Sequence, residues 1–274
     1  MSSKGAIGVF DSGVGGLTVL KEIVSLLPNE NTLYLGDTAR VPYGSKPQKT
    51  IIEYSLEDAT YLTRQNVKAL VVACNTICCL AMTDLEKAFE LPIIGVIGPA
   101  SRAAAELTRN KKVGVIATEG TINSGVYQQA IEQLDSKIEI FPKACPLFVP
   151  IVEENVLEGV IAEKIVAMYL AELKEKQLDT LVLGCTHYPL LMGPITRFMG
   201  SKVTVLDPAT AVAQELKQKL IEYQLRSDSK TEGSHKFFFT GQPQKAEKLI
   251  RRLNIRIDSI EQANLAAPPV CGCS

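Results

Sequence analysis

Short runs of apolar, often β-branched residues alternate along the chain with longer amphipathic segments. The runs are continuously apolar, which is typical of parallel strands buried on both faces. Between two of them, Ile122, Val126, Ala130 and Leu134 recur every four residues and predict one buried helix face. The alternation predicts an α/β fold with mostly parallel sheets. The expected strands span residues 6–10, 32–35, 69–73, 93–97, 113–117, 138–141, 180–183, 203–206 and 236–239.

A coarse internal repeat divides the chain. Three pairs of segments match in order, with similar offsets of 106, 111 and 110 residues: IGVFDSG (7–13) with VGVIATEG (113–120), VVACNT (71–76) with VLGCTH (182–187), and the strand at Ile93 with that at Val203. The repeat predicts two pseudosymmetric, doubly wound α/β halves that face each other across a cleft. We expect the chain to cross between the halves near Gly98 and again near Asp207.

Composition narrows the class of protein. The chain has 274 residues, of which 46% are apolar and 22% charged, and this excludes a disordered tail, a collagen or a coiled coil. Its 29 basic and 30 acidic residues give a net charge of −1, so the basic excess of a nucleic-acid binder is missing. The most apolar stretch, 69–82, is shorter than the roughly 20 residues of a membrane span, and the N-terminal residues do not fit a signal peptide. We expect a soluble, cytoplasmic protein with no nucleic-acid or membrane partner.

Seven cysteines are scattered along the chain, which suits reduced thiols better than a disulfide scaffold. A free cysteine behaves by default as a small buried hydrophobe, and we expect this of Cys78, Cys79 and Cys145. The last residues, 266–274, end in CGCS and predict a loosely ordered tail. Two cysteines without a nearby histidine make a poor zinc site.

Cys74 and Cys185 differ from the other cysteines in their position. Each directly follows an apolar strand and precedes a helix, at matching places in the repeat. Ligands of open α/β sheets bind at the carboxyl ends of strands, where a helix N-terminus also stabilises a thiolate. Two opposed thiols could form a disulfide, hold a metal, or move a proton from one face of a carbon to the other.

Polar groups near these cysteines suit an amino acid. Asp11, Ser12 and Gly13 follow the first strand and enter a glycine-rich turn, whose N–H groups can bind a carboxylate. Asp11 could also contact an ammonium group or assist a thiol. His187 lies two residues after Cys185 and can exchange a proton beside it.

Three further segments allow a structural interpretation as well as a functional one. Glu153 and Glu154 form either a solvated helix start, or one of them points into the cleft and modulates His187. The loop VPYGSKP at 41–47 has the composition of a surface turn. His235 lies in the polar stretch SDSKTEGSH and is expected to be exposed.

The motifs DSGVGGLTVL, YLGDTARVPYG, VVACNT and LVLGCTHYPLL, in this order, resemble the signatures of the glutamate racemase family, part of a superfamily with aspartate and hydantoin racemases. The resemblance implies cofactor-independent racemisation of glutamate, without pyridoxal phosphate or metal, that supplies D-glutamate for peptidoglycan. It also implies a homodimer, and an active site between two α/β domains. Residues 1–97 with 208–274 would form the domain carrying Cys74, and 98–207 the domain carrying Cys185.

The same resemblance implies roles for individual residues. Cys74 and Cys185 would be the two acid/base thiols, assisted by Asp11, His187 and Glu153. The residues implied in substrate binding are Asp11, Ser12, Pro42, Tyr43, Gly44, Asn75, Thr76, Thr118, Thr121, Thr186 and His187.

Other functions stay open at this point. Within the same class, the chain could be an aspartate or broad-specificity amino-acid racemase. From a different class, it could act as a protein-binding inhibitor of DNA gyrase, which no residue here supports. A redox dithiol protein would need the two Cα atoms within roughly 7 Å.

Overall fold

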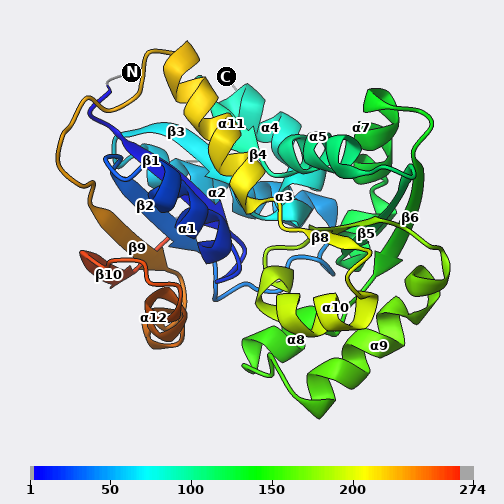
Figure 1. Ribbon diagram of the computed structural model, residues 1–274. Coiled ribbons are helices and arrows are strands. Elements are labelled where there is room, and N and C mark those ends of the chain that lie inside the picture. Colours follow the sequence, from blue (N-terminus) through cyan, green and yellow to red (C-terminus); the bar gives the residue numbers. More distant parts are fainter. Residues whose placement is uncertain (1–2, 266–274) are drawn as a thin grey trace.

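The computed structural model describes residues 3–265, and two sheets form its framework (Figure 1). Every strand pair described is parallel. The larger sheet has the order β10-β9-β2-β1-β3-β4 and the smaller one β6-β5-β7-β8. The predicted α/β fold is therefore confirmed. In chain order the strands are β1 Ala6–Asp11, β2 Thr32–Gly36, β3 Val67–Val72, β4 Ile93–Gly95, β5 Lys112–Ala117, β6 Glu139–Ala144, β7 Thr180–Gly184, β8 Thr204–Leu206, β9 His235–Phe239 and β10 Ser259–Gln262.

Helices connect the parallel strands, because parallel neighbours need a crossover connection. In Figure 1 they cover the sheets, and α11 runs back from the second sheet to lie beside α1. No described helix is long and apolar enough to cross a membrane. The helices are α1 Leu17–Leu26, α2 Gln48–Thr63, α3 Asn75–Leu80, α4 Met82–Ala88, α5 Ile97–Leu107, α6 Glu119–Asn123, α7 Val126–Leu134, α8 Phe148–Glu153, α9 Val160–Glu175, the 3-10 turn η1 Tyr188–Leu191, α10 Met192–Met199, α11 Ala209–Glu222 and α12 Pro243–Arg252.

The internal repeat corresponds to a repeated strand order. The order β2-β1-β3-β4 in the larger sheet matches β6-β5-β7-β8 in the smaller one. The segment pairs recognised in the sequence therefore occupy equivalent strands, β1 with β5, β3 with β7 and β4 with β8. As a result, Cys74 after β3 and Cys185 after β7 have equivalent places in the two halves.

The end of the described chain returns to the first half. Strands β9 and β10 extend the larger sheet beyond β2, as the family resemblance implied. The division of the core is less sharp, because Tyr127 and Ile131 of α7 belong to the same hydrophobic cluster as the larger sheet. The proposed boundaries at residues 97/98 and 207/208 stay a prediction.

Three expectations about local structure were wrong or incomplete. The edge strand β10 has the sequence SIEQ, too polar and exposed to show an apolar run. Leu134 is 48% exposed, because Gly125 with φ +67° separates α6 from α7 and rotates the buried face to Tyr127 and Ile131. His235 is buried rather than exposed, since it begins β9, where its Nδ1 lies 2.9 Å from Thr32 Oγ1. The CGCS tail lies outside the described residues.

Candidate active site

A small cavity lies where the carboxyl ends of the two sheets face each other. Its volume is about 30 Å³, enough for about two water molecules. Both halves of the repeat contribute side chains from the loops that follow β1, β2, β3, β5 and β7. The lining residues are Ser12, Val41, Pro42, Tyr43, Gly44, Cys74, Asn75, Thr76, Thr118, Val149, Gly184, Cys185, Thr186 and His187.

Cys74 is a buried free thiol at the N-terminus of α3. Its Sγ donates a hydrogen bond to Ser12 Oγ at 3.5 Å. Burial and the nearby Asp11 carboxylate raise the pKa of the Cys74 thiol to about 12. At neutral pH Cys74 is therefore protonated and can act as an acid.

Cys185 is also a buried free thiol, but its neighbours differ in charge. Its Sγ lies 3.9 Å from His187 Nδ1, and His187 Nε2 lies 2.7 Å from Glu153 Oε1. Burial opposes protonation of His187, but its contacts with Cys185 and Glu153 outweigh this and raise the pKa of the imidazole to about 10. At neutral pH a cation thus lies beside Cys185, the counter-charge that a thiolate would need.

Asp11 lies behind the cavity wall and is fully buried. Its carboxylate accepts hydrogen bonds from Gly13 N at 3.0 Å and from Thr186 Oγ1 at 3.2 Å, so it joins the two halves. Burial raises the pKa of Asp11, partly offset by the charge of His187. The turn after β1 approaches the second half so closely that only glycine fits at position 15. A Cβ on Gly15 would lie 2.4 Å from Thr186 Oγ1.

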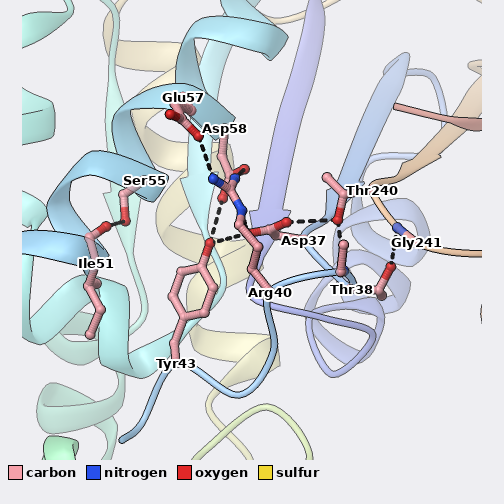
Figure 2. A network of polar contacts seen from close by, with 11 residues as sticks. Asp37, Thr38, Arg40, Tyr43, Ile51, Ser55, Glu57, Asp58, Thr240 and Gly241 are labelled. Carbon is pink, nitrogen blue, oxygen red and sulfur yellow. Dashed lines mark hydrogen bonds and ion pairs between the residues drawn. The ribbon is translucent and has the colours of Figure 1, made fainter. Parts of the chain in front are cut away.

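The loop that carries Pro42, Tyr43 and Gly44 lies at the surface, with Pro42 exposed, but its Tyr43 is 1% exposed and lines the cavity. Figure 2 shows the polar network that holds it. The Tyr43 hydroxyl donates to Asp37, and Arg40 binds Asp37 at 2.6 Å and Asp58 at 3.3 Å. Arg40 also pairs with Glu57 and lies over the Tyr54 ring, 3.9 Å from its centroid.

This network also reaches the C-terminal part of the chain. Thr240, which follows β9, donates to Asp37 Oδ1 at 2.7 Å and accepts from Ala39 N at 2.9 Å. Gly241 N donates to Thr38 Oγ1 at 2.9 Å. The cavity-lining loop is thus braced from both α2 and the returning strand β9.

Hydroxyl and amide groups join the halves on the other side of the cavity. Thr76 Oγ1 lies 3.3 Å from Thr118 Oγ1 and 3.5 Å from Thr121 Oγ1. Tyr127 on α7 donates to Asn75 Oδ1 at 2.7 Å. The residues after β3 therefore contact those after β5 directly.

The structure brings most of the implied site residues to the cavity, and the others contact them. Asp11, Thr121 and Glu153 are absent from the lining, but each touches a residue that belongs to it. Glu153 ends helix α8 rather than beginning one. Cys78 and Cys145 lie in the apolar cores, consistent with packing.

Sequence reasoning missed several residues that shape the site. Val149 and Gly184 line the cavity without carrying chemistry that a motif would display. Asp58 and Tyr127 reach the site over long sequence separations, which no local pattern encodes. Among residues 3–265, no group of three His, Cys, Asp or Glu side chains is placed to hold a metal ion.

Comparison with known proteins gives consistent matches over nearly the whole chain. The model of the Asp/Glu/hydantoin racemase family matches residues 7–216. The glutamate racemase of Geobacter metallireducens is 47% identical over 238 residues, which are 87% of this chain and 88% of that protein.

Solved structures agree with this match. A glutamate racemase isoform from Bacillus anthracis has a TM-score of 0.91 at 38% identity and covers 95% of this chain and 98% of its own. The glutamate racemase from Francisella tularensis, solved in complex with D-glutamate, has a TM-score of 0.90 at 36% identity, with 97% and 100% covered.

The fold, the cavity and these matches define the class. The chain belongs to the Asp/Glu/hydantoin racemase family, among its glutamate racemases, and is an amino-acid racemase, an isomerase.

Proposed function

We propose that this enzyme interconverts L- and D-glutamate without a cofactor, by moving the Cα proton between two thiols. The observation that carries the proposal is the pair of free thiols, Cys74 and Cys185, which line one cavity from equivalent strand ends. Racemisation needs an acid on one face of the carbon and a base on the other. The two halves of the repeat supply one thiol each.

The reaction needs one thiol and one thiolate, and the groups around the two cysteines differ in charge. A thiolate on Cys185, beside the His187 cation, takes the Cα proton and becomes a thiol. The carbanion receives a proton on its opposite face from Cys74, which becomes a thiolate. Product and substrate differ only in configuration, and the reverse reaction uses the thiols in exchanged roles.

Groups around the cavity are placed to hold an amino acid. The Asp11 carboxylate, close to Cys74, suits the substrate's ammonium group. Hydroxyl and amide donors of Ser12, Asn75, Thr76 and Thr186 suit its carboxylates. Such donors stabilise the negative charge that develops on the α-carboxylate as the proton leaves.

Substrate entry requires the two halves to separate. A cavity of about 30 Å³ is smaller than an amino acid, and contacts such as Thr76–Thr118 and Asp11–Thr186 close it from both sides. The contacts at the cavity itself are polar, so contacts with substrate can replace them.

The first experiment is incubation of the protein with L-glutamate in D₂O, without added cofactor, while optical rotation and Cα deuterium are followed together. Loss of rotation with one deuterium entering at Cα supports the proposal. Turnover of aspartate in place of glutamate would indicate the alternative substrate. No exchange with any amino acid would refute racemisation by proton transfer.

The family resemblance supports three further parts of the proposal. D-glutamate would supply peptidoglycan synthesis, which complementation of a D-glutamate auxotroph tests. A homodimer would show twice the chain mass of 29.8 kDa in light scattering. A cytoplasmic location would appear on cell fractionation.

A further inference from the structure

Tyr127 contacts a sequence neighbour of each proposed catalytic thiol: Asn75, which follows Cys74, and Gly184, which precedes Cys185. It is the second residue of α7, two residues after the left-handed Gly125, and is 1% exposed. Its hydroxyl donates to Asn75 Oδ1 at 2.7 Å, and Asn75 follows Cys74. Its ring packs against Gly184, the residue before Cys185, since a Cβ there would lie 3.2 Å from Tyr127 Cε2.

The hydrogen bond from Tyr127 fixes how Asn75 can interact with a ligand. A side-chain amide offers one acceptor oxygen and an NH₂ group with two donors. Because this hydrogen bond directs the oxygen at Tyr127, the NH₂ group, which branches away from it, is left for a partner in the cavity that Asn75 lines. Within residues 3–265 no group accepts a hydrogen bond from Asn75 Nδ2, which leaves it available to an anion.

Burial keeps this arrangement in one state. Desolvation raises the pKa of the Tyr127 hydroxyl well above its usual value, so the phenol stays protonated and remains a donor. Tyr127 also belongs to the hydrophobic cluster that contains the larger sheet. This packing holds the hydroxyl in place relative to Asn75 across the two halves.

We propose that Tyr127 is a positioning residue for racemisation: it turns the Asn75 amide so that its N–H groups face the substrate's carboxylate, and its ring supports the backbone before Cys185. The proposal rests on the proposed function, because Asn75 is the group that would touch glutamate. In this arrangement Asn75 turns its donors toward the carboxylate and Asp11 receives the ammonium group, so the two residues distinguish the charged ends of the substrate.

The test is Tyr127→Phe, assayed for glutamate racemisation and Cα exchange beside the wild type. Loss of the hydroxyl frees Asn75 to rotate, and we expect kcat/KM to fall about tenfold. The pH profile keeps its shape, because Tyr127 itself transfers no proton. In an Asn75→Ala background the same Tyr127→Phe change has no further effect, because the residue acts through Asn75.

Two further variants separate the effect of the Asn75 donors on activity from a general loss of folding stability. Asn75→Asp keeps an acceptor for Tyr127 but replaces the donors by a negative oxygen, and we expect a loss of more than a hundredfold. Tyr188→Phe removes another buried hydroxyl, which donates to the Cys145 carbonyl at 3.0 Å, and gives the stability cost of such a deletion.

Each outcome bears on one idea only. A wild type that leaves glutamate unchanged refutes the proposed function. A wild type that racemises glutamate while Tyr127→Phe has unchanged kcat/KM refutes the positioning role. Equal losses from Tyr127→Phe with and without Asn75→Ala also refute it, as does an Asn75→Asp enzyme of normal activity.

Discussion

The two halves of the molecule have the same strand order but different electrostatics at equivalent positions. In the first half, Cys74 contacts a neutral hydroxyl and lies near the buried Asp11 carboxylate. In the second, Cys185 lies beside His187, which is paired with Glu153. The Glu153 side chain is 32% exposed, so in the second half charged groups connect the thiol to the surface.

This difference shows how a repeated fold can support an asymmetric reaction step. The repeated backbone places the thiols at equivalent strand ends, which fixes where they are. The neighbouring groups differ: the Asp11 carboxylate lies near Cys74, and the His187–Glu153 pair lies beside Cys185. A two-thiol racemase needs both properties, because two thiols in the same state could not remove and return a proton in one passage.

The largest expected effect comes from removing either thiol. Cys74→Ser and Cys185→Ser should each lower racemisation more than a thousandfold, since a serine hydroxyl is a far weaker acid than a thiol. The remaining thiol can still exchange the Cα proton of one enantiomer with D₂O, and the enantiomer should be opposite in the two variants. NMR of the Cα proton with each pure enantiomer measures this.

Cys145→Ser is the matched control, since Cys145 lies in the core of the second half, outside the cavity lining. It should keep its turnover, with lower stability only. If either Cys74→Ser or Cys185→Ser retained near-normal racemisation, the two-thiol assignment would be wrong.

A second change tests whether the halves must approach as closely as the structure places them. Gly15→Ala would put a Cβ 2.4 Å from Thr186 Oγ1 and 2.6 Å from His187 Nδ1. We expect kcat/KM to fall about a hundredfold, because the turn after β1 would push these residues away from Cys185. Steady-state kinetics at saturating and limiting glutamate measure the effect.

Gly98→Ala provides the control for this change. Gly98 lies in α5, and an added Cβ would meet only the Arg102 guanidinium at 3.5 Å. Alanine also favours a helix, so activity should be unchanged and stability slightly higher. Equal activity of the Gly15→Ala and Gly98→Ala enzymes would contradict the need for close approach.

The same comparison explains what could be predicted from the sequence. Strands β3 and β7 are buried on both faces, so their apolar runs, and Cys74 and Cys185 directly after them, are visible locally. The edge strand β10 has half its residues exposed and shows no such run. The local pattern did not predict the burial of Tyr43 either, because a polar loop sequence gives no sign that Asp37 and Arg40 will fold around it; only the family motif pointed to this residue.

Side-chain pairs between the halves were beyond sequence reasoning for a different reason. The Tyr127–Asn75 hydrogen bond spans 52 residues, and the Thr186–Asp11 hydrogen bond spans 175. Such pairs depend on how the two sheets are placed relative to each other. The His187–Glu153 pair lies within the second half and spans 34 residues; the sequence offered it as one of two interpretations, and the family resemblance favoured it.

A third test alters the charge of the second half alone. Glu153→Gln removes the carboxylate that helps to raise the pKa of His187 to about 10. In the wild type we expect kcat/KM to fall as the pH rises through about 10, where His187 loses its proton. In the variant this fall should occur at lower pH, with about tenfold less activity at pH 9. A pH profile of kcat/KM measures both, with the exposed neighbour Glu154→Gln as control.

The folding stability should also depend on whether His187 is protonated. Because the pKa of His187 is raised in the folded state, its contribution is complete below about pH 6.5 and is lost as the pH rises through about 10. Wild type and Glu153→Gln should therefore differ most in unfolding free energy at the lower pH and converge above pH 10. A constant difference across this range would contradict a charged His187.

The smallest expected effect comes from loosening the brace of the first half. Thr240→Val keeps the side-chain shape but removes the hydroxyl that donates to Asp37 Oδ1 and accepts from Ala39 N. We expect about 1–2 kcal/mol less stability, because Asp37 is buried and loses a donor. The KM for glutamate should rise about threefold with kcat unchanged, since Tyr43 is held through Asp37 while both thiols stay in place.

Denaturant unfolding and steady-state kinetics on the same preparations measure the two effects of Thr240→Val. Thr210→Val is the matched control, because the Thr210 hydroxyl makes only an exposed contact of 3.4 Å with Glu22. A reduced kcat in Thr240→Val would mean that the network acts on proton transfer as well as on binding. The first half would then tune its thiol through distant buried groups, as the second half does through His187 and Glu153.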